Sequence, residues 1–230
     1  MLFRSHLADF YLRRGDPAAA IASLERGVAA IPGDVKLRHR LATLLSEKGH
    51  HMRALVAAEG GLEFAPDDPS LQGARVRALA GLGRWAEAEA AAKQALQSNA
   101  NNAELHAILA EAYQARGEYL SARAELRQAV ELAPHEGRWQ RAYGATVRMV
   151  GMLKGLTRSD FEAGMAALEK ALQLEGELAE TRMEMGLLCW LHGEREKALA
   201  HMARAVELEP ERADYRINLG TALRAADRAH

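Results

Sequence analysis

The residues best suited to binding chemistry form a basic stripe in the second half of the chain. Arg138, Arg141 and Arg148 follow one another at intervals of three and seven residues, which place side chains on one face of a helix. A guanidinium group can form two parallel hydrogen bonds with a carboxylate, so the stripe could receive an acidic peptide. The alternative is pairing with Glu180 and Glu184, because surface charges are commonly solvated or paired locally.

A second candidate is an apolar strip formed by Met183, Leu187 and Trp190, which helical periodicity also places on one face. Methionine and tryptophan are favoured where proteins contact partners. Two interpretations stay open: the strip is exposed and binds a partner, or neighbouring side chains or the long segment before it cover it. Arg40 and Arg77 are second-rank candidates on the corresponding helices of earlier segments.

Residues that could support catalysis or hold a metal are few. His50 and His51 are adjacent in the sequence, and no cysteine or carboxylate cluster accompanies them to complete a tetrahedral metal site. The sequence has no glycine-rich phosphate loop and no Gly-x-Ser-x-Gly motif. Cys189 falls on an apolar helix position, which favours a buried, inert thiol. We therefore expect no enzyme activity, no cofactor and no metal.

The elements that position these residues are expected to be helices. Aromatic residues make up 5% of the chain and prolines number six, whereas residues with a low cost of helix formation dominate. The formal net charge of -1 argues against nucleic acid as a partner, since such binding needs a basic surface. No apolar run is long enough to span a bilayer, and the N-terminus lacks the layout of a signal peptide. We expect a cytoplasmic protein without membrane insertion, although a removed leader would leave no trace.

An internal repeat organises the chain. Pro32 and Pro66 lie 34 residues apart, and Pro134 follows two periods later, with Ala100 at the intermediate place. Counted this way, repeats start at Met1, Val35, Pro69, Ala103, Gly137, Ala179 and Ala213.

Small residues recur within each repeat because two helices that cross closely need a contact point with little side chain. The eighth place holds Ala8, Ala42, Val76, Ala110, Gly144, Gly186 and Gly220, and the twentieth holds Ala20, Ala54, Ala88, Ala122, Gly164 and Ala198. Large residues occupy the eleventh place, at Tyr11, Leu45, Leu79, Tyr113, Cys189 and Leu223.

Turn signals separate the two predicted helices of each repeat. Glycines at positions 15, 49, 83, 117 and 193 are expected to end the first helix in the left-handed conformation, which glycine adopts at least cost. Asp16 and Pro17 then form an N-cap and a first helical residue.

This pattern of small residues and a terminal proline resembles the tetratricopeptide repeat, and the resemblance covers essentially the whole chain. It implies an all-α, right-handed superhelical solenoid of antiparallel helix pairs, whose first helices line a concave face that usually holds a peptide or a partner helix. We expect one solenoid domain over residues 1–230, with a closing helix whose outer side is polar. The expected repeats are 1–34, 35–68, 69–102, 103–136, 137–178 and 179–212, and the closing helix is 213–230.

The fifth repeat is longer than the others by about eight residues. Ser159 and Glu162 form a capping-box pattern that predicts the start of its second helix. The first helix would then project beyond its neighbours and carry Met152, Leu153 and Leu156, an apolar set that predicts contact with a partner or a second copy of the chain. The alternative is a bent loop folded over the adjacent repeat.

The leading interpretation is a scaffold or adaptor that binds a peptide or helix of another protein, first through Arg138, Arg141, Arg148 and Trp190. Two rivals remain. The chain could assemble with copies of itself through the fifth-repeat projection, or it could be the recognition arm of a larger enzyme such as a transferase.

Overall fold

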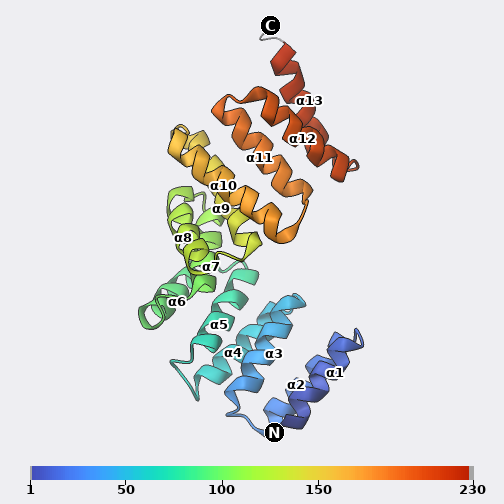
Figure 1. Ribbon diagram of the computed structural model, residues 1–230. Helices are drawn as coiled ribbons and strands as arrows, with labels where there is room; N and C mark the ends of the chain where they lie inside the picture. The colour runs from blue at the N-terminus through green and yellow to red at the C-terminus, as the bar shows by residue number, and fades with distance from the viewer. Residues whose placement is uncertain (1, 228–230) are drawn as a thin grey trace. The chain divides into compact units, whose positions relative to one another are not determined.

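The computed structural model describes residues 2–227, with side chains from residue 7 to residue 226. This part of the chain contains thirteen α-helices and no strand, which confirms the predicted all-α repeat architecture (Figure 1). The helices are α1 Leu2–Arg13, α2 Pro17–Ala30, α3 Val35–Glu47, α4 His51–Leu62, α5 Pro69–Gly81, α6 Trp85–Ser98, α7 Ala103–Ala115, α8 Tyr119–Leu132, α9 Gly137–Lys154, α10 Arg158–Glu175, α11 Ala179–His192, α12 Arg195–Leu208 and α13 Ala213–Asp227.

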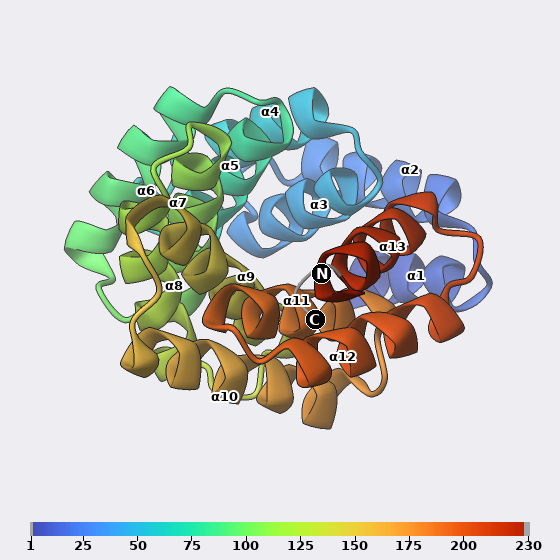
Figure 2. The same cartoon turned by 90° about the horizontal axis from the view of Figure 1, so that it is seen from above.

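The contacts divide the chain into two compact units, residues 1–116 and residues 117–230, and each is described by itself. Unit 1 contains α1 to α7, and unit 2 contains α8 to α13. Within each unit, consecutive helices form hairpins; α9 and α10, and likewise α11 and α12, lie side by side (Figure 2). The expectation of one continuous domain stays a prediction.

Local signals fix the ends of the helices. Asp16, Asp34, Asp68 and Asn102 each accept a hydrogen bond from a backbone N–H in the first turn of the helix that follows. The predicted turn glycines are confirmed, because Gly15, Gly49, Gly83, Gly117 and Gly193 all have a positive φ, between 69° and 92°. Each first helix is therefore stopped by a residue without a side chain, and the chain can reverse at once.

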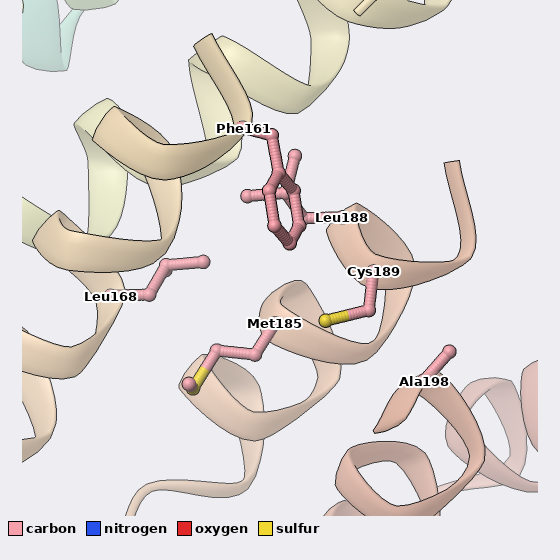
Figure 3. Packing of buried hydrophobic residues seen from close by; sticks show 6 residues of the cluster. All are labelled: Phe161, Leu168, Met185, Leu188, Cys189 and Ala198. Carbon is pink, nitrogen blue, oxygen red and sulfur yellow. The ribbon is translucent and has the colours of Figure 1, made fainter. Parts of the chain in front are cut away.

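Small residues at the eighth place let paired helices approach each other. A Cβ atom added to Gly144 would lie 2.5 Å from Cγ of Leu168, and one added to Gly186 would lie 2.7 Å from Cγ of Met202. Both distances are shorter than van der Waals contact, so larger residues here would push α10 away from α9, or α12 away from α11. The core of unit 2 builds on these crossings, with buried Phe161, Leu168, Met185, Leu188, Cys189 and Ala198 (Figure 3).

A hydrogen bond recurs at the junctions between repeats. The fourth residue of a first helix donates a side-chain N–H to the backbone carbonyl six residues earlier, just after the preceding second helix. The donor and acceptor pairs are Arg38 with Pro32, Gln72 with Pro66, His106 with Ala100 and Gln140 with Pro134, with lengths from 2.6 to 3.2 Å. These bonds give a partner to backbone carbonyl groups of the turns that connect the repeats.

The additional residues of the fifth repeat lengthen both of its helices. α9 and α10 have 18 residues each, whereas the other helices have 12 to 15. The predicted start of α10 at Ser159 is wrong by two residues: Thr157 is the N-cap, its hydroxyl oxygen accepts from the N–H of Asp160 at 3.1 Å, and it donates to the Asp160 carboxylate at 2.7 Å. The turn needs only Gly155 and two further residues, so the helix begins earlier than Ser159.

The closing helix departs from expectation on its outer side. α13 packs on α12 through Tyr215, Leu219 and Ala222, as the stack requires. Its outer side was expected to be polar, yet Ile217 is exposed there, and Leu223 at the edge of the packed face is exposed as well.

Candidate functional site

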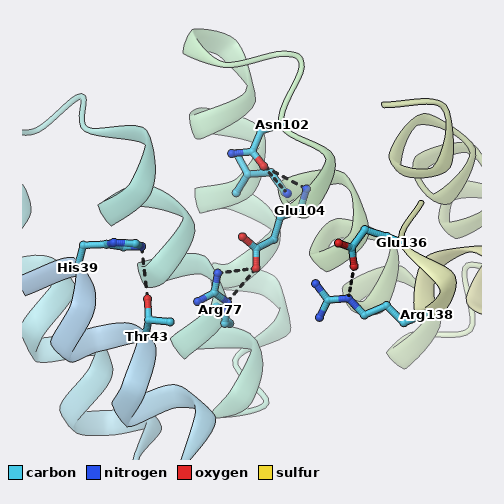
Figure 4. A network of polar contacts seen from close by, with 8 residues as sticks. His39, Thr43, Arg77, Asn102, Glu104, Glu136 and Arg138 are labelled. Atoms are coloured by element: carbon cyan, nitrogen blue, oxygen red, sulfur yellow. Dashed lines mark hydrogen bonds and ion pairs between the residues drawn. The ribbon is translucent and has the colours of Figure 1, made fainter. Parts of the chain in front are cut away.

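The first helices of unit 1 carry ion pairs that run from one repeat to the next. α3 contacts α5, and α5 contacts α7. Arg40 of α3 pairs with Asp9 of α1. Arg77 of α5 pairs with Glu104 of α7, as Figure 4 shows. The predicted binding residues Arg40 and Arg77 are therefore already matched by carboxylates. Each such surface pair stabilises by under about 1 kcal/mol, so a ligand carboxylate could compete for the guanidinium group at modest cost.

Arg77 also shapes the charge of the neighbouring histidine. Burial lowers the pKa of His39, and the positive charge of Arg77 lowers it further. The His39 ring lies 3.3 Å from the Thr43 hydroxyl, one helical turn away, as Figure 4 shows. The imidazole is therefore neutral near pH 7 and adds no second positive charge beside Arg77.

A hollow of about 270 Å³ opens beside Arg77, and we call it the Trp85 hollow. On its lining the ring of His51 packs against Gly81, where any side chain would collide with the imidazole. Apolar groups dominate the lining, with a few polar groups at the margin, a composition typical of ligand sites. The lining residues are Ser46, Glu47, His51, Arg77, Ala80, Gly81, Trp85, Ile108 and Glu111.

In unit 2, two of the three predicted arginines are held by carboxylates. Arg148 contacts Glu184 of α11 at 2.7 Å, and both side chains are largely buried. Arg141 lies 3.0 Å from Glu175 and 3.5 Å from Glu180. Local pairing with Glu180 and Glu184, one of the two alternatives considered, is thus what these side chains adopt.

Arg138 differs from the other two arginines of the stripe. Its side chain is 59% exposed, with Glu136 at 3.4 Å and the ring of Trp139 5.0 Å from the guanidinium carbon. Exposed pairs of this kind contribute little to stability. Of the three arginines, Arg138 is consequently the most available to a ligand.

The apolar strip on α11 is more covered than expected. Met183 is only 3% exposed, because α13 packs over it with Tyr215, and Asn218 contacts its sulfur. The expectation of an open strip is therefore wrong for Met183, which is a core residue. Leu187 and Trp190 are half-buried against the same cluster, and Arg195 lies over the Trp190 ring at 5.3 Å. These two keep part of their surface accessible.

The last turn of α9 and the turn after it, residues 151–157, form what we call the α9–α10 extension. Gly151 lies against Leu156 and Leu191, so the inner side of the extension packs on the end of α11. On its outer side Met152 and Leu153 are exposed, Leu153 to 65%. Leu153 also borders a hollow of about 230 Å³ with Tyr119 and Leu120 of α8. Of the three predicted contact residues, Met152 and Leu153 are accessible, and Leu156 is half-buried against the core.

The described residues offer neither a reactive thiol nor a metal-binding cluster. Cys189 is buried, and burial raises the pKa of its thiol to about 11, so the reactive thiolate does not form near pH 7. Among residues 2–227, no three histidine, cysteine or acidic side chains gather in a way that could hold a metal ion. Within the same range, no helix combines the length and apolar character needed to cross a membrane.

The helical pairs and these surfaces define a helical-repeat protein of the kind that serves as an interaction scaffold. A model of the tetratricopeptide repeat matches residues 11–78 and 79–145, together more than half of the chain. The chain belongs to the tetratricopeptide-repeat family, whose members are generally non-catalytic scaffolds for protein–protein interaction. No curated protein matches the sequence significantly.

Solved structures with a similar fold include PilF of Pseudomonas aeruginosa, with a TM-score of 0.77, 14% identity and coverage of 95% of this chain and 96% of that one. PilW, described as a type IV pilus biogenesis factor, has a TM-score of 0.76, 18% identity and coverage of 94% and 97%. YrrB, described as having an unusual peptide-binding site, has a TM-score of 0.66, 19% identity and coverage of 89% and 97%. At these identities the likeness concerns the fold.

Proposed function

We propose that the chain binds a peptide or helix of another protein on the face of its first helices, and that the Trp85 hollow receives an apolar side chain of that ligand. The observation that carries the proposal is the hollow itself, an apolar depression lined by a tryptophan and bordered by the Arg77–Glu104 pair. Tryptophan and arginine are enriched among residues that dominate binding energy. YrrB, a protein of similar fold, is described as having a peptide-binding site.

In unit 2 the proposal keeps Arg138, Leu187 and Trp190 as ligand contacts. Arg141 and Arg148 hold neighbouring helices together through their carboxylates, and a ligand would reach them only by exchange of these pairs. Met183 takes no part, because α13 covers it.

The proposal is tested with a substitution that fills the Trp85 hollow and leaves the rest of the surface unchanged. Ala80→Leu places a larger side chain in the hollow, and Ala90→Leu adds the same atoms at an exposed position of α6 outside it. We expect a partner recovered from native lysate by the wild-type chain to be retained by the Ala90 variant and reduced at least about tenfold by the Ala80 variant. Quantitative mass spectrometry measures recovery, and circular dichroism checks the fold. Equal recovery by all three baits contradicts the proposal.

Self-association through the α9–α10 extension is the second candidate function, favoured by the exposure of Met152 and Leu153 next to exposed Leu120. Contiguous exposed apolar groups are commonly contact sites. In this case Leu153→Glu lowers the molar mass measured by multi-angle light scattering, and Lys170→Glu, at an exposed position of α10 outside the extension, leaves it unchanged. A single mass for all three proteins at every concentration excludes this candidate.

A further inference from the structure

The outer side of α13 carries a stripe of residues one helical turn apart. It consists of Ala213, Arg216, Ile217, Gly220 and Arg224, and it borders a shallow hollow of about 320 Å³. Leu223 adjoins it. We call this set the α13 stripe.

Ile217 and the adjoining Leu223 have the types of core residues but not their burial. The eleventh place of the repeat is buried at Leu45, Leu79, Tyr113 and Cys189, whereas Leu223 at the same place is 45% exposed. Ile217 is 64% exposed, although its counterpart one repeat earlier, Met183, is buried. The sequence thus continues the pattern of a packed helix on a side that nothing in the described residues covers.

Gly220 shows which kind of element would fit. Its counterparts Gly144 and Gly186 are each crossed by a second helix, through Leu168 with the Gly164 carbonyl and through Met202 with the Ala198 carbonyl. Around Gly220, no described atom lies within 4 Å of an added Cβ. The stripe therefore reproduces the surface on which α10 and α12 pack, and it fits a helix with a small residue, a large apolar residue four positions later and a small residue three positions after that.

Charge decides between a second copy of this chain and another protein. If two α13 helices crossed antiparallel at Gly220, Arg216 of one would face Arg224 of the other, because each lies four residues from the glycine. Two like charges brought together in an interface oppose association. Neither arginine forms an ion pair within the described part of the chain, so both can receive carboxylates of a ligand.

We propose that the α13 stripe docks an amphipathic helix of another protein that has the small–large–small pattern and a net negative charge. The stripe lies outside the Trp85 hollow and the α9–α10 extension, so this site is separate from the functions proposed above. Its occupant would extend the stack by one helix, as α12 extends it beyond α11.

Two helices of this chain provide matched probes. The α10 peptide, Arg158–Glu175, has the pattern Gly164, Leu168 and Ala171 with four acidic and two basic residues. The α12 peptide, Arg195–Leu208, has the pattern Ala198, Met202 and Ala205 with two acidic and three basic residues. Fluorescence anisotropy measures binding of each labelled peptide to the whole chain.

We expect the α10 peptide to bind more tightly than the α12 peptide. Gly220→Leu fills the crossing point and should weaken α10 binding at least about tenfold, and Arg216→Glu with Arg224→Glu should weaken it by a similar factor. Ala90→Leu, which adds an apolar side chain at an exposed position of α6 outside the α13 stripe, should change nothing. Because Gly220 lies in open space, its replacement by leucine leaves room for the fold, which circular dichroism verifies.

Three results would overturn the proposal. The first is no binding of the α10 peptide up to about 1 mM, or equal binding by wild type and the Gly220 variant. The second is an α12 peptide that binds as tightly as the α10 peptide. The third is a dimer of the wild-type chain that Gly220→Leu dissociates, which would assign the stripe to a second copy.

Discussion

At the scale of single residues, two histidines are kept neutral by their surroundings. Burial lowers the pKa of His39 and of His201, and the adjacent Arg77 and Arg182 lower them further. In the unfolded chain a histidine titrates near pH 6.5. Below that pH the unfolded chain binds more protons than the folded chain, so stability present at neutral pH is lost as the pH falls through about 6.5.

We expect His201→Gln to flatten the dependence of Tm on pH between about pH 7.5 and 5.5, because glutamine can accept from Arg182 and cannot be protonated. Differential scanning calorimetry at several pH values measures this. His135→Gln, at an exposed position, is the control and should follow the wild-type curve. Parallel curves for all three proteins would show that His201 does not link protonation to folding.

At the scale of the element, the start of α10 depends on one hydroxyl group. Thr157→Ala removes the acceptor for the Asp160 N–H and should lower the free energy of unfolding by about 1 kcal/mol. Ser159→Ala, two residues further along and exposed, should cost much less. Urea titration followed by circular dichroism measures both. A larger loss for Ser159 would move the N-cap back to the position that the sequence pattern alone suggested.

Sequence signals predicted the elements well where the relevant residues are neighbours in the chain. Gly49 ends one helix and Asp16 begins another through contacts within a few residues, so residue type is enough. The prediction of a cap at Ser159 was wrong because serine and threonine both cap helices, and only the length of the turn places Thr157 at the cap.

The candidate sites were less predictable because their partners lie about one repeat away. Arg77 meets Glu104 across adjacent first helices, a pair that the sequence analysis did not name. The pairing of Arg148 with Glu184 was one of two alternatives, and the sequence alone did not decide between them. Met183 was expected to be accessible. Its burial depends on α13, the helix of the following repeat, and the pattern of α11 alone does not show that contact. The Trp85 hollow is lined by side chains from five helices, α3 to α7, and the periodicity within one helix does not predict that they meet.

At the scale of the whole molecule, each helix contacts only nearby helices, so damage should stay local. Leu168 is fully buried in the core of unit 2, and Leu168→Ala should cost about 3 kcal/mol. Hydrogen exchange with mass spectrometry should show faster exchange in α9 to α12 and unchanged exchange in α1 to α4. Uniformly faster exchange along the chain would instead indicate a single cooperative unit.

The side-chain bonds at the repeat junctions bear on how such an array can grow. Donor and acceptor lie only six residues apart, as in Gln72 with Pro66 and Gln140 with Pro134. A gene duplication that copies one repeat period therefore also copies the donor and the acceptor of this hydrogen bond. No compensating change is needed elsewhere in the chain. By contrast, the partners of the Arg77–Glu104 and Arg148–Glu184 pairs lie 27 and 36 residues apart and at different places of the repeat in the two cases, so each pair would have to be acquired separately. The hydrogen bonds that join the repeats can thus be inherited with each duplication, whereas the charged residues on the surface diverge afterwards and independently.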